Sequence, residues 1–268
     1  MRGLLWGLAL ACAAVCGSSI PAMGIEHGNL DEGHPLRFED PYPIPQGEWS
    51  IESGIGFQHL GDRGRLPTLN KDHVFLPIDV LYGAALNTQF SLGTGWSTRA
   101  VSDSVPGSKS IESSDLRISA LYNFRQETMS LPALALKYTL ELPTGTRSEG
   151  VDTEIKALVT KSISPLSFHF NLTDRFIGER PFGGRSSLLI FDLGASLPLA
   201  LSHGGRNLLL AGWHSEQGPY RGLDNMTGFG LGIRRQQTAR TVLDAGVETE
   251  SSYGVTNLRF TGGLSWSY

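Results

Sequence analysis

The chain has 268 residues with 33 Gly and 14 Pro, a charged fraction of 18% and a formal net charge of −4. This length allows one large domain or two small ones, and a composition low in charge and rich in turn-forming residues favours an all-β chain over a helical enzyme. The slightly acidic balance excludes the broad basic surface that binding to nucleic acid needs.

Residues 1–24 have the pattern of a secretory signal peptide. Arg2 supplies a positive start, an uncharged apolar stretch follows, and Ala22-Met23-Gly24 offers small residues at a cleavage site. A membrane anchor is the alternative, but small residues and a proline interrupt the stretch before it reaches the ~20 apolar residues of a spanning helix. Cys12 and Cys16 both lie inside this segment, without a good lipobox before them. We therefore expect an exported chain without a disulfide or thiol chemistry.

Residues 25–46 precede the first segment with strand periodicity and are rich in Pro and in charged residues. Such a segment could plug the interior of the β-structure that follows, or it could remain outside as a periplasmic tether. We favour the tether.

From residue 47 onward, apolar and polar residues alternate with a period of two. In the stretch from Trp49 to Gln58 the odd positions are mostly apolar and the even ones polar or small, as in a strand with one apolar face. The pattern recurs in twelve segments, of which the ninth alternates poorly. They are residues 49–58, 74–82, 90–96, 116–124, 134–142, 155–159, 166–172, 189–195, 207–214, 229–233, 243–247 and 258–268.

The connections between these segments alternate between longer and shorter ones. An even number of strands joined in this way is typical of a bacterial outer-membrane barrel, which has long extracellular loops and short periplasmic turns. Residues 47–268 therefore predict a transmembrane antiparallel up-and-down β-barrel of 12 strands, surrounded by outer-membrane lipid and lipopolysaccharide. The alternative is a water-soluble periplasmic sandwich or lipocalin-like barrel, with the apolar faces pointing inward.

Two features favour the membrane over the soluble alternative. The polar faces carry many short residues, as at Gly228, Gly230 and Gly232, and few charges for a solvated exterior. The last strand ends in an aromatic residue, Tyr268, which is typical of a strand that closes the ring and serves as a signal to the barrel assembly machinery. With this topology, six aromatic residues should gather outward-facing at the periplasmic rim and Trp96 should lie at the opposite rim. The six are Trp49, Tyr82, Tyr122, Phe124, Trp266 and Tyr268.

Short motifs resemble a family of bacterial outer-membrane proteins named for a putative role in the meta-cleavage pathway of phenol degradation. They are Gly33-His34-Pro35-Leu36, Glu39-Asp40, Gly47-Glu48-Trp49 with Glu52, and Leu142-Pro143-Thr144-Gly145. The resemblance implies an outer-membrane barrel of the transporter type, without a demonstrated substrate.

Charged residues on the polar faces are the candidate functional residues, because those faces should line the lumen. They are Glu52, Asp115, Arg117, Lys137, Glu141, Glu154, Lys156, Asp192, Arg234, Asp244, Glu248 and Arg259. They could select solutes by charge and width, or they could fill a narrow lumen with compensating ion pairs. Signs are mixed on neighbouring strands, which favours the ion pairs, although both readings can hold in a small channel.

No metal, cofactor or catalytic residue is expected. Histidines and carboxylates lack metal-ligand spacing, and the adjacent His214 and Ser215 would face opposite sides of a strand and could not act as base and nucleophile. The leading hypothesis is passive passage of small solutes, hydrophobic or aromatic ones included. A structural or assembly role with a closed, ion-paired lumen is the first alternative, and a lipid-modifying barrel enzyme is the second.

Overall fold

The computed structural model describes residues 30, 33–59, 72–100, 109–146, 150–179, 182–199, 206–252 and 254–268. The predicted signal peptide lies outside these ranges. Among the described residues, no helix is long and apolar enough to cross a membrane. The strands are β1 (Trp49–His59), β2 (Asp72–Ala85), β3 (Thr88–Ala100), β4 (Lys109–Ser113), β5 (Leu116–Arg125), β6 (Ala133–Leu142), β7 (Asp152–Ile163), β8 (Leu166–Phe176), β9 (Ser187–Leu199), β10 (Arg206–Glu216), β11 (Met226–Thr238), β12 (Thr241–Ser252) and β13 (Val255–Ser267).

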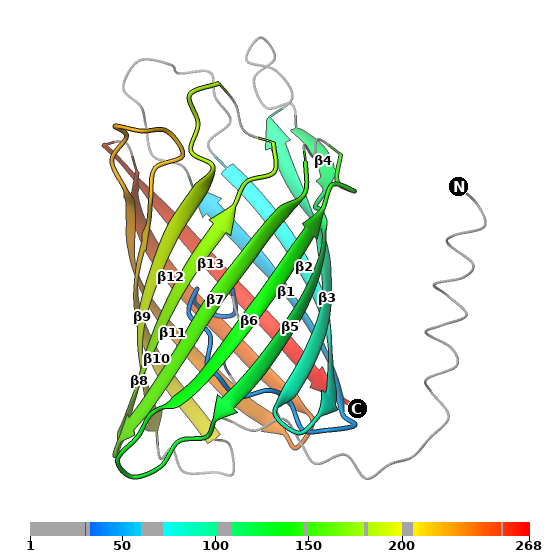
Figure 1. Ribbon diagram of the computed structural model, residues 1–268, viewed down its shortest axis with the longest axis vertical. Helices are drawn as coiled ribbons and strands as arrows, with labels where there is room; N and C mark the ends of the chain where they lie inside the picture. Colours follow the sequence, from blue (N-terminus) through cyan, green and yellow to red (C-terminus); the bar gives the residue numbers. More distant parts are fainter. Residues whose placement is uncertain are drawn as a thin grey trace, which may run out of the picture.

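The strands form one closed antiparallel ring (Figure 1). Neighbours in the ring are neighbours in the chain, and β1 closes the ring by pairing with β13, from Ser50 opposite Ser267 to His59 opposite Leu258. A closed ring leaves no unpaired strand edge, which is what a barrel inside a lipid bilayer requires. The predicted antiparallel up-and-down barrel is confirmed.

The fourth position of the ring is occupied by two strands in succession. β3 pairs with β5 up to Gly93 opposite Arg117, and with β4 from Trp96 opposite Ser113. β4 and β5 are thus one barrel strand with an interruption at residues 114–115. The thirteen strand labels of the described residues therefore correspond to the twelve predicted barrel strands.

Residues 143–146, which follow β6, form hydrogen bonds with residues 115 and 116 at this interruption. The Leu116 main-chain N–H donates to the Thr144 hydroxyl at 2.9 Å, and the Gly145 N–H donates to the Asp115 carboxylate at 2.7 Å. These bonds satisfy main-chain groups that would otherwise lose their ladder partners. The Leu-Pro-Thr-Gly motif thus has a structural role at the break in the wall.

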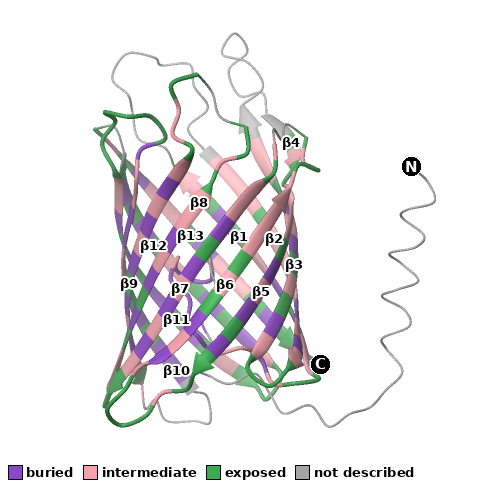
Figure 2. Ribbon diagram, viewed as in Figure 1, coloured by how far each residue is buried: buried purple, intermediate pink, exposed green. Residues whose placement is uncertain are grey.

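The barrel carries apolar side chains outside and polar ones inside. On β9 the side chain of Asp192 is 4% exposed and its neighbour Leu193 is 47% exposed; on β13 Ser265 is 2% exposed and Trp266 is 42% exposed. Figure 2 shows the resulting alternation of buried and exposed residues along the strands. A water-soluble barrel has the opposite arrangement, so the soluble alternative is wrong.

The segment before β1 lies inside the ring, where Figure 1 shows it as the blue trace. Leu36 and Phe38 form a buried cluster with Leu30 and with Leu208 and Leu210 of β10. The prediction of a periplasmic tether is therefore wrong for residues 33–46, which we call the plug. The plug also explains why β10 alternates poorly, because two of its inward positions are leucines that contact the plug.

The aromatic residues predicted at one rim lie at the ends of strands that meet at one end of the barrel. Trp49 begins β1 and stacks on Tyr82 with ring centroids 4.4 Å apart, and Trp266 packs edge-on against Tyr268. Tyr122 and Phe124 near the end of β5 are also exposed on the outer face. Trp96 is exposed in the other half of β3, where that strand pairs with β4. The predicted outward facing is confirmed.

Candidate functional site

The twelve charged residues predicted to line the lumen lie on the inner face of the wall. Seven are buried, namely Glu52, Glu154, Lys156, Asp192, Arg234, Asp244 and Glu248, and five are half-buried, namely Asp115, Arg117, Lys137, Glu141 and Arg259. Their placement follows from the strand alternation, since each one neighbours outward-facing apolar residues. The side chains do not all meet in one cluster, because they gather around different parts of the plug.

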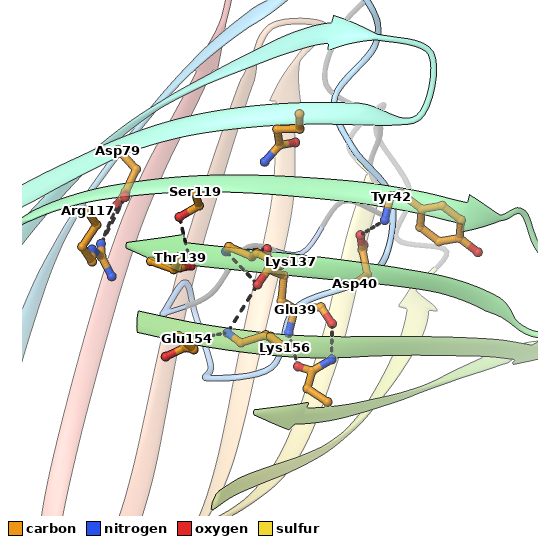
Figure 3. Close-up of polar contacts among 12 residues, drawn as sticks. Glu39, Asp40, Tyr42, Asp79, Arg117, Ser119, Lys137, Thr139, Glu154 and Lys156 are labelled. Atoms are coloured by element: carbon orange, nitrogen blue, oxygen red, sulfur yellow. Dashed lines mark hydrogen bonds and ion pairs between the residues drawn. The ribbon is translucent and has the colours of Figure 1, made fainter. Parts of the chain in front are cut away.

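A row of alternating charges runs across the inner face of β6, β7 and β8 and includes Glu39 of the plug (Figure 3). The Lys137 ammonium from β6 donates to both Glu39 carboxylate oxygens, at 2.8 and 2.9 Å. On β7, the Lys156 ammonium lies 3.5 Å from Glu39 and 3.6 Å from Glu154, which in turn accepts from Arg175 at 3.1 Å. Each charge in this row has an opposite neighbour, as charges out of water require.

A second group of charges surrounds Arg37 of the plug. Its guanidinium pairs with Glu250 and lies 3.8 Å from Glu248, both on β12. It also lies 3.1 Å from the Nε2 of His214, whose Nδ1 is 2.6 Å from Asp192. His214 thus joins the plug to β9 and β10.

The enzyme alternative would need His214 to act together with Ser215. Ser215 follows His214 on the extended strand β10 and lies on the opposite face of the wall. His214 instead contacts Asp192 and Arg37. The two residues therefore do not form a base and a nucleophile.

Side-chain amides hold the main chain of the plug. Asn171 donates to the Glu39 carbonyl and accepts from the Glu39 N–H, both at 2.8 Å. Asn123 donates to the Pro41 carbonyl at 2.7 Å, and Gln89 accepts from the Ile44 N–H at 2.9 Å. The plug is not a strand, so its buried main-chain groups need these partners.

Glycines on the inner face leave the space that the plug occupies. An added Cβ at Gly194 would lie 2.5 Å from the Phe38 ring, and one at Gly54 would lie 1.9 Å from the His34 ring. Both distances are shorter than any normal contact. The short residues on the polar faces therefore have a steric reason, which is the volume of the plug.

Several contact residues were missed at the sequence level. Both carboxylate oxygens of Asp79 on β2 accept hydrogen bonds from Arg117, at 3.1 and 3.2 Å. Asp79 lies on the polar face of the predicted strand 74–82, opposite its apolar residues. Arg175 and Glu250 lie beyond the predicted ends of their segments, because the strands extend to Phe176 and Ser252. The alternation could have identified Asp79, whereas the other two needed the true strand lengths.

Two adjoining chambers border the plug. One has a volume of about 160 Å3 and reaches Glu39, and the other has a volume of about 280 Å3 and reaches His34 and Arg37. Five acidic and three basic side chains line the smaller chamber, whereas four acidic and five basic ones line the larger. Both chambers share Asp79, Arg117, Glu154 and Arg175. The lumen is therefore polar, with charges of both signs in near balance.

No protein-family model matches the chain, and no curated protein sequence matches it. Several solved structures do. The COG4313 outer membrane channel from Pseudomonas putida F1 matches with a TM-score of 0.58 and 14% identity, over 89% of this chain and 100% of that chain. The NanC porin matches with a TM-score of 0.55 and 10% identity, over 81% of this chain and 98% of that chain. The KdgM porin in complex with disordered oligogalacturonate has a TM-score of 0.53 and 12% identity, over 82% of this chain and 99% of that chain.

At these identities the likeness shows the fold alone. The chain has the closed antiparallel barrel fold of known outer-membrane channels and porins. The resemblance to the family named for the meta-cleavage pathway stays a prediction, because no family model confirms it.

Proposed function

We propose that the chain is an outer-membrane channel that allows passive passage of small solutes along its polar lumen, past the plug. The observation that carries this proposal is the pair of adjoining chambers, lined by charged side chains, inside a ring with an apolar exterior. Membrane lipid suits such an exterior, and a polar lumen lowers the cost of moving polar solutes across the hydrocarbon layer. Neither step requires a nucleotide or a metal.

Conductance in planar lipid bilayers tests the channel. We expect a small conductance with weak preference between cations and anions, because the two signs of charge nearly balance in the chambers. Replacement of residues 25–46 by a Gly/Ser linker of equal length should raise the conductance severalfold, because the plug fills part of the lumen. Absence of conductance from both proteins would refute the channel.

The ion pairs and the plug also favour a second candidate, a structural barrel with a closed lumen. Glu39 of the plug is held in the lumen by Lys137 and Lys156, and the chamber that it borders has a volume of about 160 Å3. This candidate predicts no conductance from the full chain and a clear conductance once the plug is replaced. The same pair of measurements therefore separates the two candidates.

A further inference from the structure

At one height of the barrel, the strand pairing is interrupted both between β1 and β2 and between β3 and the β4–β5 interruption. Between the pairs Gly93–Arg117 and Trp96–Ser113, the described contacts that join β3 to the interruption are one main-chain bond and one side-chain bond. The Ser114 N–H donates to the Gly95 carbonyl at 2.9 Å, and the Thr94 hydroxyl donates to the Ser114 carbonyl at 3.4 Å. Few main-chain bonds would therefore need to break for the wall to widen here.

A proline weakens the neighbouring strand at the same level. Pro77 of β2 lies opposite Gly95 and has no N–H to donate. On its other side, β2 pairs with β1 at Ser53–Ile78 and next at Gly56–Phe75, and the two positions between these pairs are not paired. A proline in the interior of a closed sheet is uncommon, since it removes a ladder bond.

A cavity of about 210 Å3 lies at this weakly bonded place and is lined from both faces of the wall. Leu76 and Trp96 belong to the outer face and are 42% and 44% exposed, whereas Asp115, Arg117 and Glu141 belong to the inner face. Arg117 also lines both lumen chambers. The cavity therefore adjoins the lumen on one side and the apolar exterior on the other.

We propose that this place, lined by Leu76, Pro77, Thr94, Trp96, Ser114 and Arg117, is a lateral portal between the lumen and the bilayer for a small amphipathic molecule. The proposal rests on the proposed outer-membrane channel. The apolar part of the molecule lies against Leu76 and Trp96, and its polar group faces the charged inner mouth at Arg117. A dry cavity of about 150 Å3 holds a benzene molecule, so this cavity accommodates a six-carbon chain or one ring together with a polar group.

Cysteine labelling tests whether the cavity connects the two sides. The chain has no cysteine after Cys16, so Ser114→Cys introduces a single thiol into the portal of the exported protein. In phosphatidylcholine vesicles we expect this thiol to react both with N-cyclohexylmaleimide dissolved in the bilayer and with a charged, membrane-impermeant thiosulfonate. Two control variants mark the faces. Leu231→Cys, on the outer face of β11, should react with the apolar reagent alone, and Ser119→Cys, on the inner face of β5, with the charged reagent alone.

Filling the outer mouth should close the portal selectively. Thr94→Trp in the Ser114→Cys protein should slow the apolar reagent roughly tenfold and leave the charged reagent unaffected, because overpacking excludes a second apolar group. Thr249→Trp is the matched control. Like Thr94, Thr249 lies on the outer face and its hydroxyl donates to a carbonyl of the neighbouring strand, at 3.5 Å, but it belongs to β12 and does not line the portal. Hexanoate should slow the apolar reaction, whereas glucose should not.

Reaction of Ser114→Cys with only one of the two reagents would overturn the portal. Equal effects of Thr94→Trp and Thr249→Trp would overturn it as well, and failure of hexanoate to compete would overturn the class of ligand. These results do not depend on conductance. If the protein conducts ions but Ser114→Cys does not react with both reagents, the proposed channel function stands and only the lateral portal is refuted.

Discussion

At the scale of single residues, the plug depends on Glu39, because two lysines share its carboxylate. Glu39→Gln leaves Lys137 and Lys156 facing each other with less compensation, and removing one member of a buried ion pair costs about 3–5 kcal/mol. We expect a larger fraction of open plug, seen as a higher conductance and faster maleimide labelling of a cysteine placed at Ile44. Glu39→Gln combined with Lys137→Gln should recover part of the loss, and an additive result in this double-mutant cycle would contradict the pairing.

A second residue-scale prediction concerns Glu127, in the turn between β5 and β6. The Glu127 carboxylate accepts from the Tyr42 hydroxyl of the plug, from Lys161 and from the Ser162 main chain, at 3.2, 2.8 and 2.6 Å. Partial burial raises the pKa of this carboxyl, but the bonds from Lys161 and Ser162 outweigh it, and the pKa lies below its ordinary value. The stabilisation is therefore complete above the ordinary pKa of a glutamate, about 4.3, and is lost as the pH falls through the lowered value.

The free energy of unfolding of the barrel as a function of pH measures this contribution. Between neutral pH and about pH 5 the contribution of Glu127 to the free energy of unfolding should stay constant, and at lower pH it should fall. The variant Glu127→Gln removes the titrating group and should flatten the acid limb of the profile. An unchanged acid limb in this variant would assign the pH dependence to other groups.

At the scale of elements, the fit between β9 and the plug is steric. Gly194→Val places a branched side chain where the Phe38 ring lies, and we expect the plug to be displaced while the ring stays closed. The expected result is a raised conductance together with normal folding of the barrel. Ala195→Val, which introduces the same side chain on the outer face of the same strand, should have no effect, and Phe38→Ala should relieve the clash in Gly194→Val. If Gly194→Val left the conductance unchanged, the plug would not need the space beside Gly194.

The barrel strands could be predicted because their signal is local. Each one repeats every second residue, and the facing follows from which alternate positions are apolar. The predicted ends were less accurate, as Arg175 and Glu250 show, since the polar residues near the rims interrupt the apolar pattern before the ladder ends. At the division of one barrel strand into β4 and β5, residues 143–146 bond to residues 115 and 116, and no periodicity reveals these contacts.

The plug could not be predicted in the same way, because its contacts are distant in the sequence. The Thr261 hydroxyl bonds the Pro35 carbonyl across 226 positions, and Asn171 bonds Glu39 across 132. The glycines that accept the plug are also compatible with a lumen simply lined by small residues. The poor alternation at Leu208 and Leu210 was the one local sign of an apolar partner inside the ring.

At the scale of the whole molecule, the apolar exterior determines where the protein is stable. We expect it to fractionate with outer membranes and to migrate faster in gel electrophoresis before heating than after, because the closed ring resists detergent until it is heated. Extraction as a soluble periplasmic protein would contradict the membrane location, and identical migration before and after heating would contradict a stable closed ring. Truncation of β13 before Phe260 should abolish the heat-dependent shift, since β1 would lose its partner.

In the described part of the chain, side chains bond the plug to the wall and strand pairing does not. The plug therefore behaves as a tethered ligand of the barrel. Its covalent attachment to β1 gives it an effective concentration in the millimolar range. A synthetic peptide of residues 30–46 should therefore block the barrel whose plug has been replaced, at concentrations at which it cannot displace the attached plug of the intact protein. The dissociation constant of that peptide, compared with the effective concentration, would give the fraction of time for which the intact lumen is open.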